Sequence, residues 1–448
     1  MKAPIAPTSF VDFFRLSAPY IHAHRGRTFV VMFGGEAVID EAFPLLVQDV
    51  ALMHSLGVRL VLVHGSKPQI DLRMRERGLR PRFHQGVRVT DPATMRCVED
   101  AVGNTRIRIE GLLSMGLPTS PMAHARIRVA SGNFVVARPV GVRDGVDFQR
   151  TGGVRRIDAE AIKLRLDAGA IVLISPLGYS PAGEAYNLSS HEVASAAAVA
   201  LGADKLLQLV EGKGVVDRRG RTIAQLTPTE ADELTQAGKH LHDDTVKHLA
   251  AASRACREGV RRCHLVARRV DGSMLQELFT REGKGTLVTA ERYEDMRPAR
   301  LDDIPGLLQL LAPLEEAGIL VRRSRETLEQ EIERFTVVER DGMVIGCAGL
   351  EAFSPENVGE LYCLAVLSRY REAGRGEALV EYIAERARAM GLSGLFVLTT
   401  QTSDWFRERG FEPASVRALP EARKLRYDRS RRSKVLVRDL ARGPLEDA

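Results

Sequence analysis

The chain is poor in several features that would assign it to a class at once. Its five cysteines show neither the density of a disulfide framework nor the paired spacing of a metal site, so we expect reduced thiols and no metal. No apolar run approaches the roughly 18 residues that cross a bilayer, and Asp12 and Arg15 interrupt the region where a signal peptide would be apolar. A cytoplasmic protein without a membrane partner is therefore expected.

Neither sign of charge dominates, because a net charge of +6 is small for 448 residues. Basic residues crowd positions 423–434, but only Tyr427 is interleaved with them, so nucleic-acid binding is not expected. A solvated face or a site for small acidic ligands fits better. With 44% hydrophobic residues and this length, the chain should form two or three globular domains.

Residues 1–26 predict a separate helix, in which Phe10, Phe13 and Phe14 share one face. Pro19 predicts a kink or a two-piece helix. The apolar face either packs on its own chain or docks on a neighbouring subunit as an oligomerisation arm, and the sequence leaves both open.

Strand-like runs alternate with helical segments over residues 27–288, which predicts a parallel sheet covered on both faces, an αβα sandwich. These runs are 28–33, 58–63, 170–174, 205–210 and 263–267. The pattern changes near Thr289. Residues 289–448 instead predict a meander of antiparallel strands with helices, an α+β domain.

The turn Arg371-x-x-Gly374-x-Gly376 joins an apolar strand to an amphipathic helix. Its glycines let backbone N–H groups point into one concavity at a helix N-terminus, which suits a pyrophosphate. The turn resembles the acetyl-coenzyme A loop of GCN5-related N-acetyltransferases. That resemblance implies acetyl-CoA as co-substrate and a strand that splays to admit its pantetheine arm. The cofactor-binding residues it implies are Cys363, Leu364, Val366, Arg371, Gly374, Arg375 and Gly376.

Acetyl transfer to an amine needs a base and a polarised thioester. Glu360, in surroundings that favour its neutral form, is the candidate base, and backbone N–H groups near Cys363 would hold the thioester oxygen. Thr399 is the candidate group that stabilises the departing thiolate. Two basic clusters, at 320–325 and 431–437, are candidates to bind an acidic acceptor. Arg323 and Arg431, with Cys363, are expected to bind it, and the other arginines of these two clusters are expected to face solvent.

Residues 27–287 resemble the amino-acid kinase family, most closely acetylglutamate kinase, through Gly34-Gly35, 64–70, 87–91 and 187–192. The family's lysine before the first Gly-Gly is replaced by Met32 and Phe33, and its organising aspartate by His191. Phosphoryl transfer depends on such charges, so neither ATP use nor kinase activity is expected.

Residues 274–286 resemble the arginine-binding segment of arginine-sensitive acetylglutamate kinases. The resemblance implies an allosteric site for L-arginine, with Glu277 as its anion. The residues assigned to this site are Tyr20, Lys247, Glu277, Gly283 and Gly285. The cluster from His240 to Asp244 could suggest a metal, but alternating histidines in a polar connector are more often solvated, and no metal is expected.

The order of the two domains resembles bacterial N-acetylglutamate synthases across almost the whole chain. It implies acetyl-CoA and L-glutamate as substrates, L-arginine as feedback inhibitor, and a homo-oligomer, often a hexamer. Two alternatives stay open: a bifunctional synthase and kinase, and a non-catalytic arginine-binding regulator.

Overall fold

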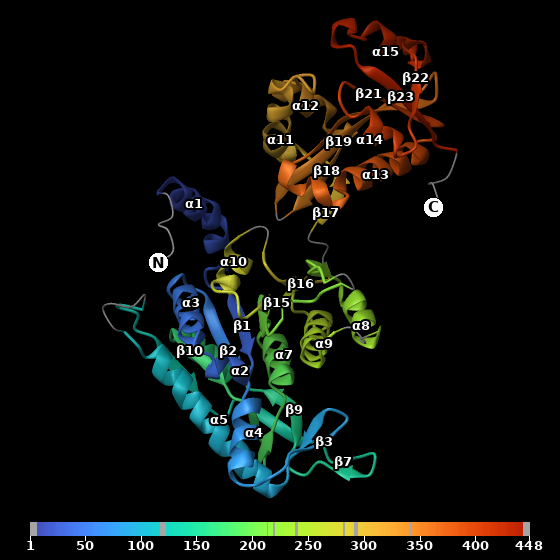
Figure 1. Cartoon of the computed structure of the whole chain (residues 1–448). Helices are drawn as coiled ribbons and strands as arrows, with labels where there is room; N and C mark the ends of the chain where they lie inside the picture. Colours follow the sequence, from blue (N-terminus) through green and yellow to red (C-terminus); the bar gives the residue numbers. More distant parts are fainter. Residues whose placement is uncertain are drawn as a thin grey trace. The chain divides into compact units, whose positions relative to one another are not determined.

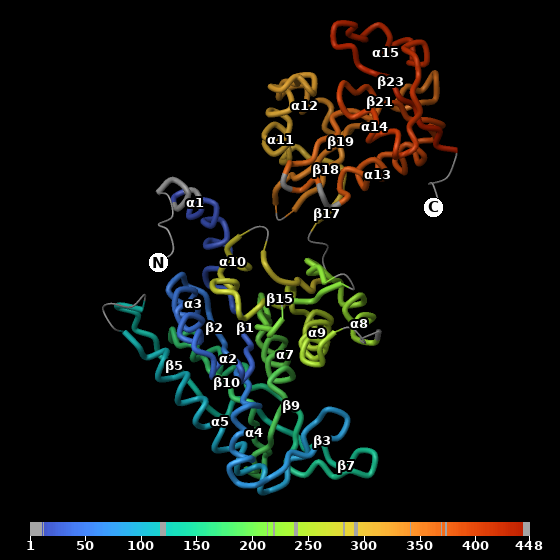
Figure 2. The backbone as a smooth tube through the Cα atoms, in the orientation of Figure 1, coloured from blue at the N-terminus to red at the C-terminus, as the bar shows by residue number. Residues whose placement is uncertain are grey.

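The chain folds into two compact units, Met1–Arg292 and Tyr293–Ala448 (Figures 1 and 2). The computed structural model describes residues 7–116, 122–212, 214–217, 220–237, 241–280, 283–290, 294–340 and 342–441. No helix in these ranges is both long enough and apolar enough to cross a bilayer.

The first unit is built on an eight-stranded sheet in the order β14-β16-β15-β13-β1-β2-β10-β5. Neighbouring strands are parallel except for β15 and β16. The strands are β1 (Thr28–Phe33), β2 (Arg59–His64), β5 (Arg128–Ser131), β10 (Ala170–Ile174), β13 (Lys205–Val210), β14 (Gln225–Leu226), β15 (Arg262–Ala267) and β16 (Thr286–Val288). The central strands are apolar along most of their length because both faces of the sheet are covered.

Alternate residues of β1 define the two covered faces. Val30 and Met32 pack under α6 (Ala159–Asp167), α7 (Ser190–Leu201), α8 (Pro228–Ala237) and α9 (Asp243–Arg257). Phe29, Val31 and Phe33 pack under α2 (Gly35–Ile39), α3 (Phe43–Ser55), α5 (Pro92–Leu113) and α10 (Ser273–Phe279). This arrangement confirms the predicted αβα sandwich.

Smaller elements extend the first unit. Helix α4 (Lys67–Glu76) packs on α5. A four-stranded sheet has the order β12-β11-β6-β9, and two hairpins pair β3 with β4 and β7 with β8. Their bounds are β3 (Arg82–His84), β4 (Val87–Val89), β6 (Val135–Pro139), β7 (Val142–Arg143), β8 (Val146–Asp147), β9 (Gly152–Ile157), β11 (Leu177–Tyr179) and β12 (Ala185–Asn187).

The N-terminal helix α1 (Pro7–His24) runs through Pro19 as one element, so the prediction of two pieces was wrong. Its C-terminal part packs on its own chain through Tyr20 and Ile21. The side chain of Phe13 is half exposed and that of Leu16 is exposed, while the side chain of Phe10 lies outside the described residues. The helix therefore divides into a packed end and an uncovered apolar end.

The second unit has a seven-stranded sheet in the order β17-β18-β19-β20-β21-β23-β22, antiparallel except between β20 and β21. The strands are β17 (Glu294–Pro298), β18 (Phe335–Arg340), β19 (Met343–Phe353), β20 (Val358–Val366), β21 (Gly394–Thr399), β22 (Glu412–Ala414) and β23 (Lys434–Asp439). The predicted α+β domain is confirmed.

Helices cover the second sheet on both faces. Helix α13 (Arg375–Ala389) and α14 (Ser403–Arg407) pack on the face that carries Leu361 and Val397. Helices α11 (Ile304–Glu316) and α12 (Arg325–Glu331) pack on the face that carries Cys347 and Cys363. The short helix α15 (Glu421–Leu425) follows β22 along the chain.

Candidate active and effector sites

Strands β20 and β21 pair only over their first residues and then part. Their parallel register runs from Val358 opposite Gly394 to Leu361 opposite Val397, whereas β20 continues to Val366 alongside β19. Cys363 has a left-handed φ of 49° where the β19–β20 register shifts, which marks a β-bulge. The parting leaves one edge of β20 free of ladder bonds to β21, and backbone N–H groups there can bind a ligand.

A loop that contains the 3-10 helix η3 (Ser368–Ala373) joins β20 to the N-terminus of α13. Gly374 is the N-cap of this helix with φ 71°, a conformation that favours glycine. The first bond back to the cap comes from the N–H of Ala378, so the preceding N–H groups in the first turn have no acceptor within the helix. A Cβ on Gly376 would lie 3.2 Å from the Trp405 ring. The Arg371 guanidinium donates to the Val366 carbonyl at 3.1 Å, which holds it beside the loop.

Arg375 was expected among the cofactor-binding residues, but its side chain is used within the fold. Its Nε and Nη2 donate to the Glu294 carboxylate at 2.7 and 2.5 Å, and its Nη1 donates to the Tyr370 carbonyl. Burial of Glu294 opposes ionisation, but hydrogen bonds from Arg375 and the charge of Arg340 outweigh it and lower its pKa. The guanidinium of Arg375 is therefore engaged within the fold, and its backbone N–H is the group that can bind a phosphate.

Glu360 is buried at 6% exposure on β20, just before the strands part. Both of its oxygens accept from the Arg423 guanidinium, at 2.6 and 3.1 Å. An arginine therefore holds both oxygens of this carboxylate. Arg423 lies in the basic stretch 423–434, and no local pattern could have paired it with a residue 63 positions away.

Glu351 lies directly opposite Glu360 on β19 and contacts Arg426 at 3.1 Å. Adjacent carboxylates on neighbouring strands repel one another, and the two arginines of the α15 segment offset that repulsion.

Arg323 lies against the bulge of β20. Its Nε donates to the Cys363 sulfur at 3.2 Å, its Nη1 donates to Glu331 at 2.8 Å, and its guanidinium stacks 4.6 Å from the centroid of the Tyr362 ring. Burial raises the pKa of the Cys363 thiol despite this cation, so the thiol stays protonated and is a weak nucleophile.

Arg431 belongs to the other basic cluster, yet it reaches the segment that leads to Arg323. Its Nη2 donates to the carbonyls of Gly318 and Ile319 at 3.1 and 2.8 Å. The structure thus brings both arginines predicted to bind the acceptor to the segment between α11 and α12.

The Thr399 hydroxyl is occupied by the turn that follows β21. It hydrogen-bonds the Thr402 hydroxyl at 2.9 Å and accepts from the Thr402 N–H at 3.1 Å. These bonds stabilise the turn, and a catalytic role would require the hydroxyl to exchange them.

In the first unit, Glu277 is a buried carboxylate with three partners. It accepts from the N–H groups of Lys284 and Gly285 at 2.5 and 2.8 Å and pairs with His264 Nδ1 at 2.6 Å. Burial opposes ionisation, but these bonds outweigh it and lower the pKa of Glu277 to about 2. A Cβ on Gly283, whose φ is 62°, would lie 2.6 Å from the same carboxylate, so the glycine permits the loop to wrap around it.

The end of α1 meets α10 next to Glu277. His24 Nε2 hydrogen-bonds the Leu278 carbonyl at 2.8 Å, and the Tyr20 ring lies 6.3 Å from that of His24. His24 and His264 were missed by the sequence analysis, because a histidine in an apolar strand or a helix end carries no local signal.

Lys247 does not join this group. It is exposed on α9, which packs on the opposite face of the sheet from α10. Its assignment to the arginine site was wrong.

Met32 is buried at 1% exposure in the core of the first unit, at the position where the kinase resemblance expects a lysine. The wild-type chain is therefore expected to form no ADP from ATP in the presence of N-acetylglutamate, because no cation at this position stabilises the transferred phosphoryl group. A coupled ADP assay checks this, with an acetylglutamate kinase as positive control. ADP formation above the rate without N-acetylglutamate would contradict it.

Two family models match the chain: the amino acid kinase family over residues 27–267 and the acetyltransferase (GNAT) family over residues 304–411. The amino-acid acetyltransferase of Pseudomonas fluorescens is 53% identical over 432 residues, which cover 96% of this chain and 99% of that protein. The amino-acid acetyltransferase of Azotobacter vinelandii is 54% identical with the same coverage.

Solved structures also match almost the whole chain. The crystal structure of N-acetylglutamate synthase from Neisseria gonorrhoeae with coenzyme A and L-arginine matches with a TM-score of 0.86 at 38% identity, covering 97% of this chain and all of that one. A second structure from that species, with coenzyme A and N-acetyl-glutamate, matches with a TM-score of 0.62 at 40% identity and the same coverage.

Proposed function

We propose that this chain, which belongs to the amino-acid acetyltransferases, transfers the acetyl group of acetyl-CoA to the α-amino group of L-glutamate. The observation that carries the proposal is the parting of β20 and β21 in front of the α13 N-terminus, with Glu360 and Arg323 beside it. The solved relative with coenzyme A and N-acetyl-glutamate holds the two products that this reaction would form.

Each group of residues in this site has one role in the reaction. The Gly374 loop and Arg371 hold the phosphates of coenzyme A, and freed N–H groups around the Cys363 bulge polarise the thioester carbonyl. Arg323 and Arg431 bind the two carboxylates of glutamate, exchanging for them the hydrogen bonds that they make to Glu331 and to the Gly318 and Ile319 carbonyls. Glu360 accepts the proton of the attacking amine, directly or through water, and Arg423 orients its carboxylate.

Coenzyme A release with each of the twenty amino acids as acceptor tests this proposal. L-glutamate should be used at least roughly a hundredfold faster than L-glutamine, because a site built for two carboxylates leaves one arginine unpaired with the amide. Thiol release that is independent of the acceptor, or equal for the two amino acids, would overturn the assignment.

We propose further that L-arginine binds beside Glu277 and inhibits the transfer. The carboxylate, the glycine loop that wraps it and the end of α1 with Tyr20 supply an anion, backbone carbonyls and an aromatic wall for a guanidinium. If arginine acts through binding, acetyl-CoA or glutamate must change arginine affinity by the same factor by which arginine changes theirs.

Glu277→Gln should weaken inhibition by L-arginine at least roughly tenfold, because it removes the anion from a buried pair while keeping the shape of the side chain. Transfer without arginine should stay near wild type. Inhibition curves and a calorimetric titration of arginine measure the effect. Gln276→Ala, on the same helix, is the matched control, and equal arginine sensitivity of Glu277→Gln and wild type would reject the site.

A cytoplasmic homo-oligomer is proposed as the working form. The five cysteines are free and buried, as reducing surroundings require. The uncovered end of α1, with Phe13 and Leu16 exposed, offers an apolar surface for a second copy of this chain.

A further inference from the structure

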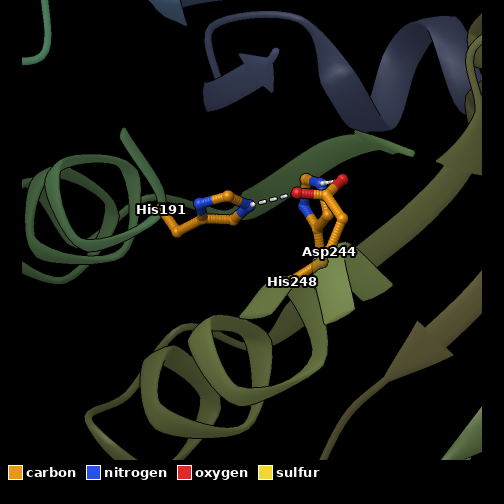
Figure 3. A group of neighbouring side chains, drawn as sticks. All are labelled: His191, Asp244 and His248. Atoms are coloured by element: carbon orange, nitrogen blue, oxygen red, sulfur yellow. Dashed lines mark ion pairs between the residues drawn. The ribbon is translucent and has the colours of Figure 1, made fainter. Parts of the chain in front are cut away.

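Three side chains from two helices of the first unit point at one spot: His191 at the start of α7, and Asp244 and His248 in the first turns of α9 (Figure 3). Their ligand atoms all lie within 4.8 Å of one another. The site shares only Asp244 with the run from His240 to Asp244, in which no metal was expected. His242 of that run caps α9 by accepting from the Asp244 N–H, and His240 lies outside the described residues.

Gln208 fixes the orientation and the proton of His248. Its Nε2 donates to the His248 carbonyl at 2.9 Å, so its Oε1 faces His248 Nδ1, also at 2.9 Å, and accepts a hydrogen bond from the Nδ1–H group. The other ring nitrogen, Nε2, then faces the Asp244 carboxylate at 3.2 Å. Two lone pairs at that distance need a positive species between them, either a proton on Nε2 or a metal ion.

His191 favours the metal over the proton. Its Nε2 is buried and has no hydrogen-bond partner in the part of the chain that the structure describes, because the Asp244 carboxylate lies 3.8 Å away, beyond hydrogen-bond reach. Its ring lies 4.3 Å from the His248 ring, so both imidazoles approach the same carboxylate. A proton on His248 would satisfy Asp244 but would leave His191 Nε2 unpaired.

The spacing also suits a metal. Ligand atoms 2.0–2.2 Å from a tetrahedral ion lie roughly 3.3 Å apart. His248 Nε2 lies 3.2 Å from Asp244 Oδ2, His191 Nε2 lies 3.8 Å from Asp244 Oδ1, and the three ligand atoms lie within 4.8 Å of one another, so an ion would draw His191 inward by a small shift of its side chain. The contact between Gln208 and His248 Nδ1 is the outer-shell bond that commonly orients a histidine ligand. Two neighbouring side chains bring no buried positive charge that would repel a metal ion. Met32, which lies next to Gln208 in the register of β1 and β13, is uncharged, and Lys247 is exposed, so its ammonium can stay in solvent.

We propose that His191, Asp244 and His248 form a divalent metal site that ties α7 to α9, with Zn²⁺ as the preferred ion and one position left for water. Two imidazoles and one carboxylate are a donor set that Zn²⁺ accepts, and Co²⁺ can replace it as a visible probe. The site lies in the first unit and does not depend on the proposed acetyl transfer.

The test uses the full chain, freed of metal with a chelator that is then removed. Calorimetric titration with Zn²⁺ should show one equivalent bound per chain, and Co²⁺ should give the visible absorption of a four-coordinate ion. Zn²⁺ should also raise the melting temperature, because it binds the folded state. Asp244→Asn and His191→Ala should each weaken Zn²⁺ binding at least roughly tenfold.

Matched controls separate this site from scattered surface histidines. Asp243→Asn changes the neighbouring exposed carboxylate, and His84→Ala removes a histidine of the β3–β4 hairpin; both should bind Zn²⁺ like wild type. Circular dichroism checks the fold of each variant. If the wild type binds no stoichiometric Zn²⁺, Asp244 and His248 share only a proton. If Asp244→Asn and Asp243→Asn bind Zn²⁺ equally, any bound ion lies elsewhere. Either result overturns the proposal.

Discussion

Gly374→Val is expected to raise the acetyl-CoA concentration needed for half-maximal activity at least tenfold. Valine at φ 71° is strained by about 1–2 kcal/mol, so the N-cap of α13 will shift and turn its N–H groups away from the phosphates. Charge-assisted hydrogen bonds are worth about 1.5–3 kcal/mol each, and the loss of one already corresponds to the tenfold change. Steady-state kinetics with acetyl-CoA as the varied substrate measures it.

Gly391→Val is the matched control for this change. Gly391 follows α13 at its other end, with φ 78° and open space where a Cβ would lie, as at Gly374. Both variants should therefore lose similar stability in thermal unfolding, while only Gly374→Val loses acetyl-CoA binding. Wild-type acetyl-CoA saturation in a folded Gly374→Val protein would remove the loop from the cofactor site.

Glu360→Gln should lower turnover about a hundredfold at neutral pH, with the half-saturating glutamate concentration little changed. A general base acts in the transition state, and its removal typically costs 10²–10⁴ in rate. Glutamine keeps the shape of the side chain and one acceptor for Arg423, so the fold should survive. Turnover and saturation with both substrates give the measurement.

Glu351→Gln provides the comparison, since Glu351 lies directly opposite Glu360 and pairs with two other arginines, Arg426 and Arg334. It should retain most of the turnover. If the two variants lose activity equally, the loss comes from disturbing Arg423 and Arg426, which pair with the two glutamates, and not from removing the Glu360 carboxylate as a base. If Glu360→Gln loses less than tenfold, another group or bulk water takes the proton.

Local patterns predicted the elements and the fold of each unit because they follow from one stretch of chain at a time. Strand 28–33 and its successors had to be buried on both faces, which requires helices on each side of a parallel sheet. The turn at Gly374 could be recognised for the same reason, since its glycines, its arginine and its helix are contiguous. The side-chain partner of Arg375 could not be predicted in this way, because Glu294 lies 81 positions away.

Partners distant in sequence were decided by tertiary structure alone. The sequence around Glu360 does not indicate that Arg423 is its partner. The sequence around Glu277 does not indicate that this carboxylate is buried, or that a hydrogen bond from His264 helps to keep it ionised. Lys247 was misplaced because a helix sequence does not say which face of the sheet it will cover.

The sequence by itself determined the two fold classes, the strand that leads into a phosphate-binding turn, and the absence of the kinase lysine at Met32, because each depends on residue type and short-range order. Only the folded chain decided which charges meet. The pairs of Glu360 with Arg423, Glu277 with His264, and Asp244 with both His191 and His248 depend on how strands and helices are packed, since a buried charge is stabilised by whichever group the fold brings within hydrogen-bond distance.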